Sequence, residues 1–154
     1  MNWQLGGLPL HPLLVHLTSV AVPVAAVTAV LVAIWPAARR WLHAGSPIVG
    51  LIALVSVPLA TSSGEWLEAR TKETAALERH THLADGLLPW AIGLFALMLG
   101  WWVWDRYGAA RVTSAGVRRI AGIGIPVVLI VAAIGTGADV VLIGHAGAVS
   151  VWSD

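Results

Sequence analysis

The chain contains no cysteine, and this absence excludes several kinds of site. Disulfides, iron–sulfur clusters and thiolate-bound metals all need cysteine, so none of them can form within this chain. Charge is also scarce, because only 11% of the 154 residues are Asp, Glu, Lys or Arg, whereas soluble domains carry about 25%. Mean hydropathy is +0.82. Lipid, rather than water, is therefore expected to cover much of the surface.

Net charge and motifs exclude further classes of function. The formal net charge is +1, and the nine Lys and Arg residues are scattered over loops, so no nucleic-acid partner is expected. The sequence has no phosphate-binding loop, nucleotide fingerprint or nucleophile motif, so it favours no particular enzyme class. It also shows no internal repeat. Because residues 1–10 lack the basic segment of a cleaved signal peptide, the first apolar run is expected to stay as a membrane anchor.

Four apolar stretches then organise the chain, at residues 13–35, 47–61, 83–104 and 120–143. At about 1.5 Å per residue, three of them match a hydrocarbon core about 30 Å thick, and the second is shorter. We therefore predict an all-α fold: an integral membrane four-helix transmembrane bundle forming a single domain over residues 1–154. The run Ser62-Ser63-Gly64-Glu65 resembles a capping box and predicts a short interfacial helix between spans two and three.

The distribution of basic residues predicts how the bundle is oriented. The loops after spans one and three carry Arg39, Arg40, Arg106, Arg111, Arg118 and Arg119, whereas the two termini carry no Lys or Arg. Short loops rich in Lys and Arg stay in the cytoplasm. We therefore predict a multi-pass protein of a bacterial plasma (inner) membrane, with both termini outside.

Five of the six histidines fall near the outer surface in this topology. His11 and His16 open span one, His80 and His82 precede span three, and His145 follows span four, while His43 lies inside. Imidazole is the commonest metal-ligating side chain, and bundle interiors are where facing helices build haem and metal sites. The pattern predicts a cofactor site at the outer end of the bundle.

Helix geometry limits which histidines can cooperate. His11 and His16 are about 140° apart on an ideal helix, so both face one site only if His11 leaves the regular turn, which Pro12 allows. His80 and His82 diverge by about 160°, so only one of them is expected to be a ligand.

Asp139 is the one clearly intramembrane charge of the predicted spans. A carboxylate within a membrane helix is costly and usually faces a partner inside the bundle. We expect Asp139 to orient a ligating imidazole from a second shell, to accept a proton, or to ligate a metal itself. A purely structural hydrogen bond to Thr136 is the alternative.

Three motifs are similar to those of a known family. They are Gly7-Leu8-Pro9-Leu10-His11-Pro12-Leu13-Leu14-Val15-His16, Glu78-Arg79-His80-Thr81-His82-Leu83-Ala84 and Gly144-His145-Ala146-Gly147-Ala148-Val149. Over nearly the whole chain they resemble the bacterial membrane family labelled domain of unknown function 2231. The resemblance implies a compact four-helix membrane domain, sometimes joined to Rieske or cytochrome c modules, and hence redox work without an assigned activity. It implicates His11, His16, one of His80 or His82, and His145. The family ending usually reads Gly-His-x-Gly-Gly, and Ala148 departs from it.

The leading interpretation is a redox or electron-transfer subunit that binds one haem b at the outer end. The predicted axial ligands are His16 together with His82 or His145. His80 is the other candidate of the His80 and His82 pair. His11 and Asp139 are expected to support the site. The first alternative is a Zn, Cu or Fe ion held by His16, His82 and His145. The second is a structural or accessory subunit without a cofactor. The expected partners are the lipid bilayer and, for electron exchange, a redox protein or a quinone.

Overall fold

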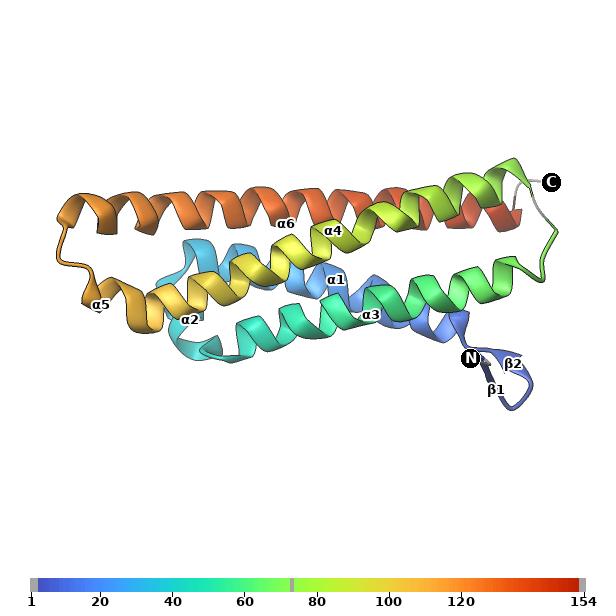
Figure 1. Ribbon diagram of the computed structural model, residues 1–154, viewed down its shortest axis with the longest axis horizontal. Coiled ribbons are helices and arrows are strands. Elements are labelled where there is room, and N and C mark those ends of the chain that lie inside the picture. Colours follow the sequence, from blue (N-terminus) through green and yellow to red (C-terminus); the bar gives the residue numbers. More distant parts are fainter. Residues whose placement is uncertain (1–2, 73, 153–154) are drawn as a thin grey trace.

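The computed structural model describes residues 3–72 and 74–152 of the chain. Four long helices run side by side along one axis (Figure 1). They are α1 (His11–Ile34), α3 (Gly45–Glu68), α4 (Ala75–Val103) and α6 (Ala115–Trp152). Each is long and apolar enough to cross a membrane. The predicted all-α four-helix bundle is confirmed, and the chain is a multi-pass membrane protein.

The four helices form a ring around the bundle axis. Helix α1 packs against α3 and α6, and α4 packs against the same two helices, so α1 and α4 lie diagonally opposite each other. Both α1 and α4 run from the end that holds the N-terminal hairpin toward the opposite end (Figure 1). Two pairs of antiparallel neighbours, α1 with α3 and α4 with α6, therefore make up the bundle.

The two ends of the bundle differ in their short elements. At one end lie α2 (Pro36–Leu42), the π-helical turn η1 (Trp104–Gly108) that continues α4, and α5 (Ala109–Arg111). We call this the basic end, because it carries the six arginines of the loops after spans one and three. At the opposite end, the strands β1 (Gln4–Leu5) and β2 (Leu8–Pro9) form a hairpin whose turn, Gly6-Gly7, has positive φ at both residues. We call that end the histidine end, since all the histidines except His43 lie toward it.

Proline sets the boundary between α1 and α2. Trp35 is extended, at φ −118° and ψ 104°, and Pro36 opens α2. The ring of a proline disfavours helical backbone at the residue before it but suits the first helical position. A single Trp35-Pro36 step therefore ends one helix and starts the next.

The predicted interfacial helix between spans two and three is not a separate element in the structure. Helix α3 continues through Ser62 to Glu68, and α4 begins at Ala75, so residues 69–74 form the connection. Ser63 does not cap a new helix, because its hydroxyl donates to the carbonyl of Ala60 within α3 at 2.8 Å. The capping-box pattern does not start a new helix here, because α3 continues through it. A separate short helix, α2, instead joins spans one and two.

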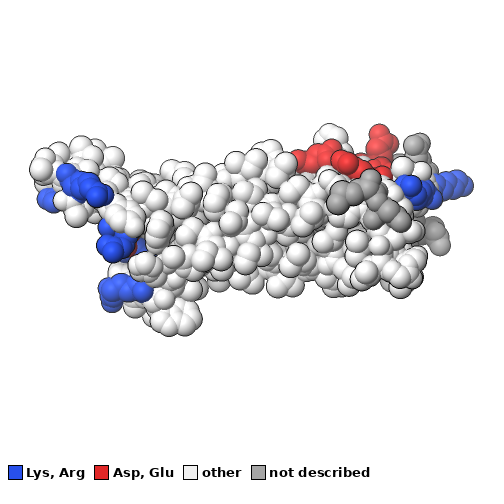
Figure 2. Space-filling view, turned by 60° about the horizontal axis from the view of Figure 1, so that its bottom comes forward, with Lys and Arg blue, Asp and Glu red and all other residues white. Residues whose placement is uncertain are grey.

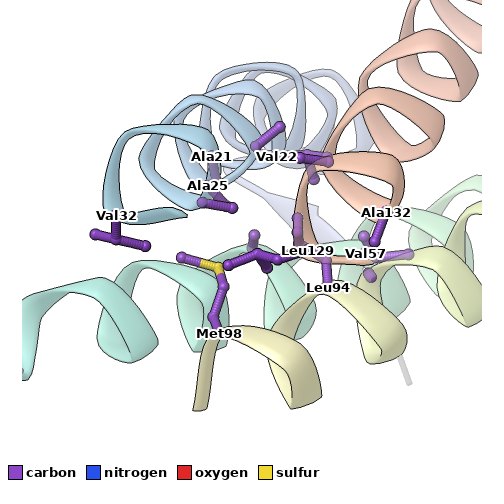
Figure 3. Close-up of a cluster of buried hydrophobic side chains, with 14 of the residues drawn as sticks. Ala21, Val22, Ala25, Val32, Val57, Leu94, Met98, Leu129 and Ala132 are labelled. Atoms are coloured by element: carbon purple, nitrogen blue, oxygen red, sulfur yellow. The ribbon is translucent and has the colours of Figure 1, made fainter. Parts of the chain in front are cut away.

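Small side chains on α1 let the neighbouring helices approach the bundle axis. Ala25 and Ala29 are fully buried, in a cluster with larger side chains from the other three helices, and Figure 3 shows several members of this cluster. Between membrane helices the packing of small residues replaces much of the hydrophobic driving force. The larger members include Val57 of α3, Leu94 and Met98 of α4, and Leu129 of α6.

The outside of the bundle is apolar along its middle and charged at its ends. Val131 and Ile134 of α6, for example, are more than half exposed. Figure 2 shows Lys and Arg side chains at one end and acidic with basic side chains toward the other, with an uncharged belt between them. An exposed apolar belt of this kind fits contact with lipid acyl chains.

Candidate functional site

His11, the first residue of α1, turns toward α3. Its Nδ1 atom lies 3.1 Å from the carbonyl oxygen of Ala60 and 3.1 Å from Oγ of Ser63. A carbonyl oxygen can only accept, so Nδ1 carries the proton and donates it to Ala60. We infer from this network that Nε2 of the neutral ring keeps its lone pair.

His80, in the second turn of α4, makes the corresponding contact with α6. Its Nδ1 atom lies 3.2 Å from the carbonyl oxygen of Ile143, and the ring is part-buried. The same reasoning assigns the proton to Nδ1 and the lone pair to Nε2. Two imidazoles in the same tautomer therefore lie at the same end of the bundle.

Each histidine ring packs against a glycine of the neighbouring helix. Gly64 lies four residues after Ala60, and a Cβ atom built on it would stand 2.9 Å from Cε1 of His11. Gly147 lies four residues after Ile143, and its Cβ would stand 3.1 Å from Cε1 of His80. A side chain at Gly64 would force the His11 ring to shift, and one at Gly147 would press on the His80 ring.

The same arrangement of histidine, carbonyl and glycine occurs in both helix pairs. In each helix pair, a histidine of the first helix bonds a carbonyl of the second and packs on the glycine one turn later. In these two pairs α1 corresponds to α4 and α3 corresponds to α6, and α1 and α4 lie diagonally opposite each other. The site is therefore built from two equivalent halves.

The sequence predicted a different selection of histidines. His16, His82 and His145 are exposed, and Nδ1 of His16 is 2.6 Å from the carbonyl oxygen of Pro12 in its own helix. Among residues 3–72 and 74–152, no group of three or more His, Asp or Glu side chains could hold a metal ion. The predicted set His16, His82 and His145 is thus not gathered in the structure. The expected divergence of His80 from His82 is present, with His80 as the inward member.

Asp139 lies one turn deeper than Ile143, at the interface between α6 and α4. Its Oδ2 atom is buried without a hydrogen-bond partner in the described part of the chain, 3.8 Å from where a Cβ of Gly86 would be. Thr136, its predicted structural partner, instead donates to the carbonyl of Ala132 at 2.7 Å. The carboxyl is therefore placed one turn below the His80 contact but does not bond either inward imidazole.

The glycine contacts predict a test of how closely the rings are packed. Gly64→Ala is expected to lower the free energy of unfolding by about 1 kcal/mol, because the new Cβ forces His11 away from α3. Gly144→Ala is the control, since nothing lies within 4 Å of its Cβ position. Unfolding in mixed detergent micelles measures both. Equal stability of the two variants would contradict the close packing of His11 on Gly64.

Sequence reasoning found His11 and His80 but not their partners. Ala60 and Ile143 contribute only backbone carbonyls. Every residue has such a carbonyl, so the sequence cannot indicate which one is used. Gly64 and Gly147 were the features of the sequence that could have indicated these contacts. A glycine on a membrane helix often lies where a neighbouring helix or side chain approaches closely. Comparison with known proteins found no matching family model, no matching curated protein and no matching solved structure. The resemblance to the family labelled domain of unknown function 2231 therefore stays a prediction.

Proposed function

We propose that this protein is a membrane redox subunit that binds one haem b at its histidine end, with His11 and His80 as axial ligands. The observation that supports this proposal is the matched hydrogen bonding of the two rings, each with Nδ1 bound to a backbone carbonyl. Such a bond fixes the tautomer, orients the ring and makes Nε2 a better ligand. The two histidines come from opposite helices of the bundle.

The donor set fits haem better than a bare metal ion. A haem supplies four nitrogen ligands of its own and takes one or two further ligands from the protein. A protein-bound zinc ion needs three or four side chains, and the described residues contain no such group. The number of inward imidazoles, two, matches the ligands that a haem takes and falls short of those that a zinc ion needs. We therefore propose His11 and His80 as the haem ligands in place of His16, His82 and His145.

A bound haem b would supply one-electron transfer at this end of the bundle, with a redox protein or a quinone as the exchange partner. The residues of the chain would hold the cofactor, exclude water with the surrounding apolar helices and tune its potential through the buried environment. Asp139 lies one turn deeper than Ile143. A carboxyl there is a candidate to adjust the local field.

The optical spectrum of the purified protein tests the haem proposal. The protein is expressed with ample haem, purified in detergent, and measured oxidised and then reduced. We expect a Soret band with reduced α and β bands typical of two imidazole ligands, and one haem per chain. A preparation with no Soret band under these conditions rules the proposal out.

A cofactor-free structural role is the second candidate, and the glycine contacts favour it. Both rings are already bonded and packed on backbone, as interhelical locks would be. In that case the purified protein has no Soret band, yet His11→Ala still lowers its stability. Hydrogen bonds between membrane helices contribute about 0.6 kcal/mol on average, so the expected loss is modest.

We also propose that the basic end faces the cytoplasm of a bacterial cell, as the bias of Lys and Arg toward cytoplasmic loops suggests. The chain has no native cysteine, so single cysteines report orientation directly. Thr113→Cys, at the basic end, should resist an impermeant thiol reagent added to intact cells. Thr71→Cys, between α3 and α4, should react with it. Labelling of Thr113→Cys but not of Thr71→Cys would show that the basic end faces outward.

A further inference from the structure

A small cavity lined partly by charged side chains lies at the basic end, far from the inward histidines. Arg39, His43, Ser46, Trp102, Asp105 and Arg106 contribute to its lining. Its volume is about 30 Å³, which is enough for one water-sized group. The cavity therefore has room for one oxygen atom of a ligand whose remainder stays at the mouth.

The guanidinium of Arg39 is held in a fixed position beside this cavity. Its Nη1 atom lies 3.5 Å from Oδ1 of Asp105, and its Cζ atom lies 4.8 Å from the ring centroid of Trp101. Trp101 is itself fixed, because its Nε1 donates to the carbonyl of Val32 at 3.1 Å. A stacked and ion-paired arginine loses little side-chain entropy when it binds a ligand.

Trp102, which contributes to the lining of the cavity, carries an unused hydrogen-bond donor. Its Nε1 atom is buried and has no hydrogen-bond partner in the described part of the chain. The ring lies edge-on to His43, with centroids 6.3 Å apart, and to Tyr107, with centroids 6.0 Å apart. A buried N–H without an acceptor is costly. An acceptor from outside the chain would remove that cost.

The backbone around the cavity is unusual on both sides. Residues Trp104–Gly108 form a π-helical turn, and His43 has a positive φ of 43°. π-Helical turns and left-handed non-glycine residues both recur at binding sites, where they direct side chains that a regular helix would not. Here Arg106 lies within the π-helical turn, and His43 lies edge-on to Trp102.

We propose that this cavity binds a phosphoryl oxygen of an anionic phosphate group, with the Nε1 donor of Trp102 and the guanidinium groups of Arg39 and Arg106 as its partners. Arg39 and Arg106 carry two positive charges against the one negative charge of Asp105. An anion is therefore preferred, and charge-assisted hydrogen bonds from guanidinium to phosphate are strong.

The position of the cavity fits a lipid headgroup as the source of the phosphate. It lies where α1 ends and where α4 passes into η1, next to the apolar belt. Basic pockets between helix ends on the cytoplasmic side are where anionic headgroups are recognised. Free inorganic phosphate has the same chemistry and is the other source. This proposal is independent of haem binding.

Native mass spectrometry in detergent tests the site with phosphatidylglycerol and phosphatidylcholine as probes. The wild-type protein is expected to bind phosphatidylglycerol more tightly than the zwitterionic lipid. Trp102→Phe keeps an aromatic ring but removes the donor, and Arg106→Gln removes a charge from an exposed residue. Each should weaken phosphatidylglycerol binding about tenfold. Arg118→Gln is the control, because it removes a charge from the same end outside the cavity.

Inorganic phosphate, titrated in the absence of added lipid, separates the two sources. If phosphate stabilises the wild-type protein against heat but not Trp102→Phe, the site binds free phosphate. If phosphate does not stabilise the wild-type protein and phosphatidylglycerol binds tightly, the ligand is the lipid. An equal loss of lipid binding in Arg118→Gln and Arg106→Gln would overturn the proposal, since it would show attraction to charge alone. Unchanged binding of both probes in Arg106→Gln would overturn it as well.

Discussion

Replacing Leu129 by alanine is expected to lower the free energy of unfolding by about 2 kcal/mol, mainly through the cavity that the substitution leaves. Leu129 is fully buried, among side chains from all four long helices. In lipid the gain from leaving water is largely absent, so the lost packing contacts dominate the effect. Reversible unfolding in mixed detergent micelles measures the difference.

Leu142→Ala is the matched control for this experiment. Leu142 belongs to the same helix, but 56% of its side chain is exposed on the lipid-facing belt. Removing its methyl groups leaves no cavity, because lipid fills the space. A loss of stability for Leu142→Ala equal to that for Leu129→Ala would contradict the arrangement of the core in Figure 3.

The sequence predicted the bundle because hydrophobicity and length determine it. The stretch 13–35 closely matches α1, His11–Ile34. The stretch 47–61 underestimates α3, which runs from Gly45 to Glu68, because hydropathy marks only the apolar part of a helix. Backbone hydrogen bonding continues into the polar residues beyond, and no residue before Ala69 stops it.

The choice of inward histidines could not be predicted in the same way. Whether His80 or His82 turns inward depends on how α4 is rotated about its axis as it packs against α3 and α6. Periodicity predicted that the two would diverge, which they do. It could not predict that His80 would meet the carbonyl of Ile143, since that carbonyl belongs to the backbone.

The repeated construction was hidden in the sequence for a related reason. The two halves share a histidine, a carbonyl and a glycine, but little else needs to be alike. Ser63, beside His11, corresponds to Ala146 before Gly147, and both are buried. Ser63 offers the His11 ring a hydroxyl that Ala146 cannot offer the His80 ring. Backbone geometry is preserved between the halves where side-chain identity is not.

The His11 and His80 variants carry the largest expected change in cofactor binding. His11→Ala and His80→Ala are each expected to reduce haem content by more than the roughly 10–100-fold that loss of an outer-shell partner costs. His82→Ala and His145→Ala should retain the Soret band, because both side chains are exposed. Loss of the band in His82→Ala or His145→Ala, with retention in His11→Ala, would instead favour the axial ligands predicted from the sequence.

A small-residue variant separates a ligand from a structural lock. In His80→Gly, free imidazole added during reconstitution can occupy the space beside Gly147 and supply the missing nitrogen. The low-spin spectrum with two imidazole ligands is then expected to return, while His11→Ala without imidazole stays haem-free. A lock would behave differently, because imidazole restores an iron ligand but does not rejoin α4 to α6. If imidazole restores neither the spectrum nor the stability of His80→Gly, His80 belongs to the helix interface and does not bind iron.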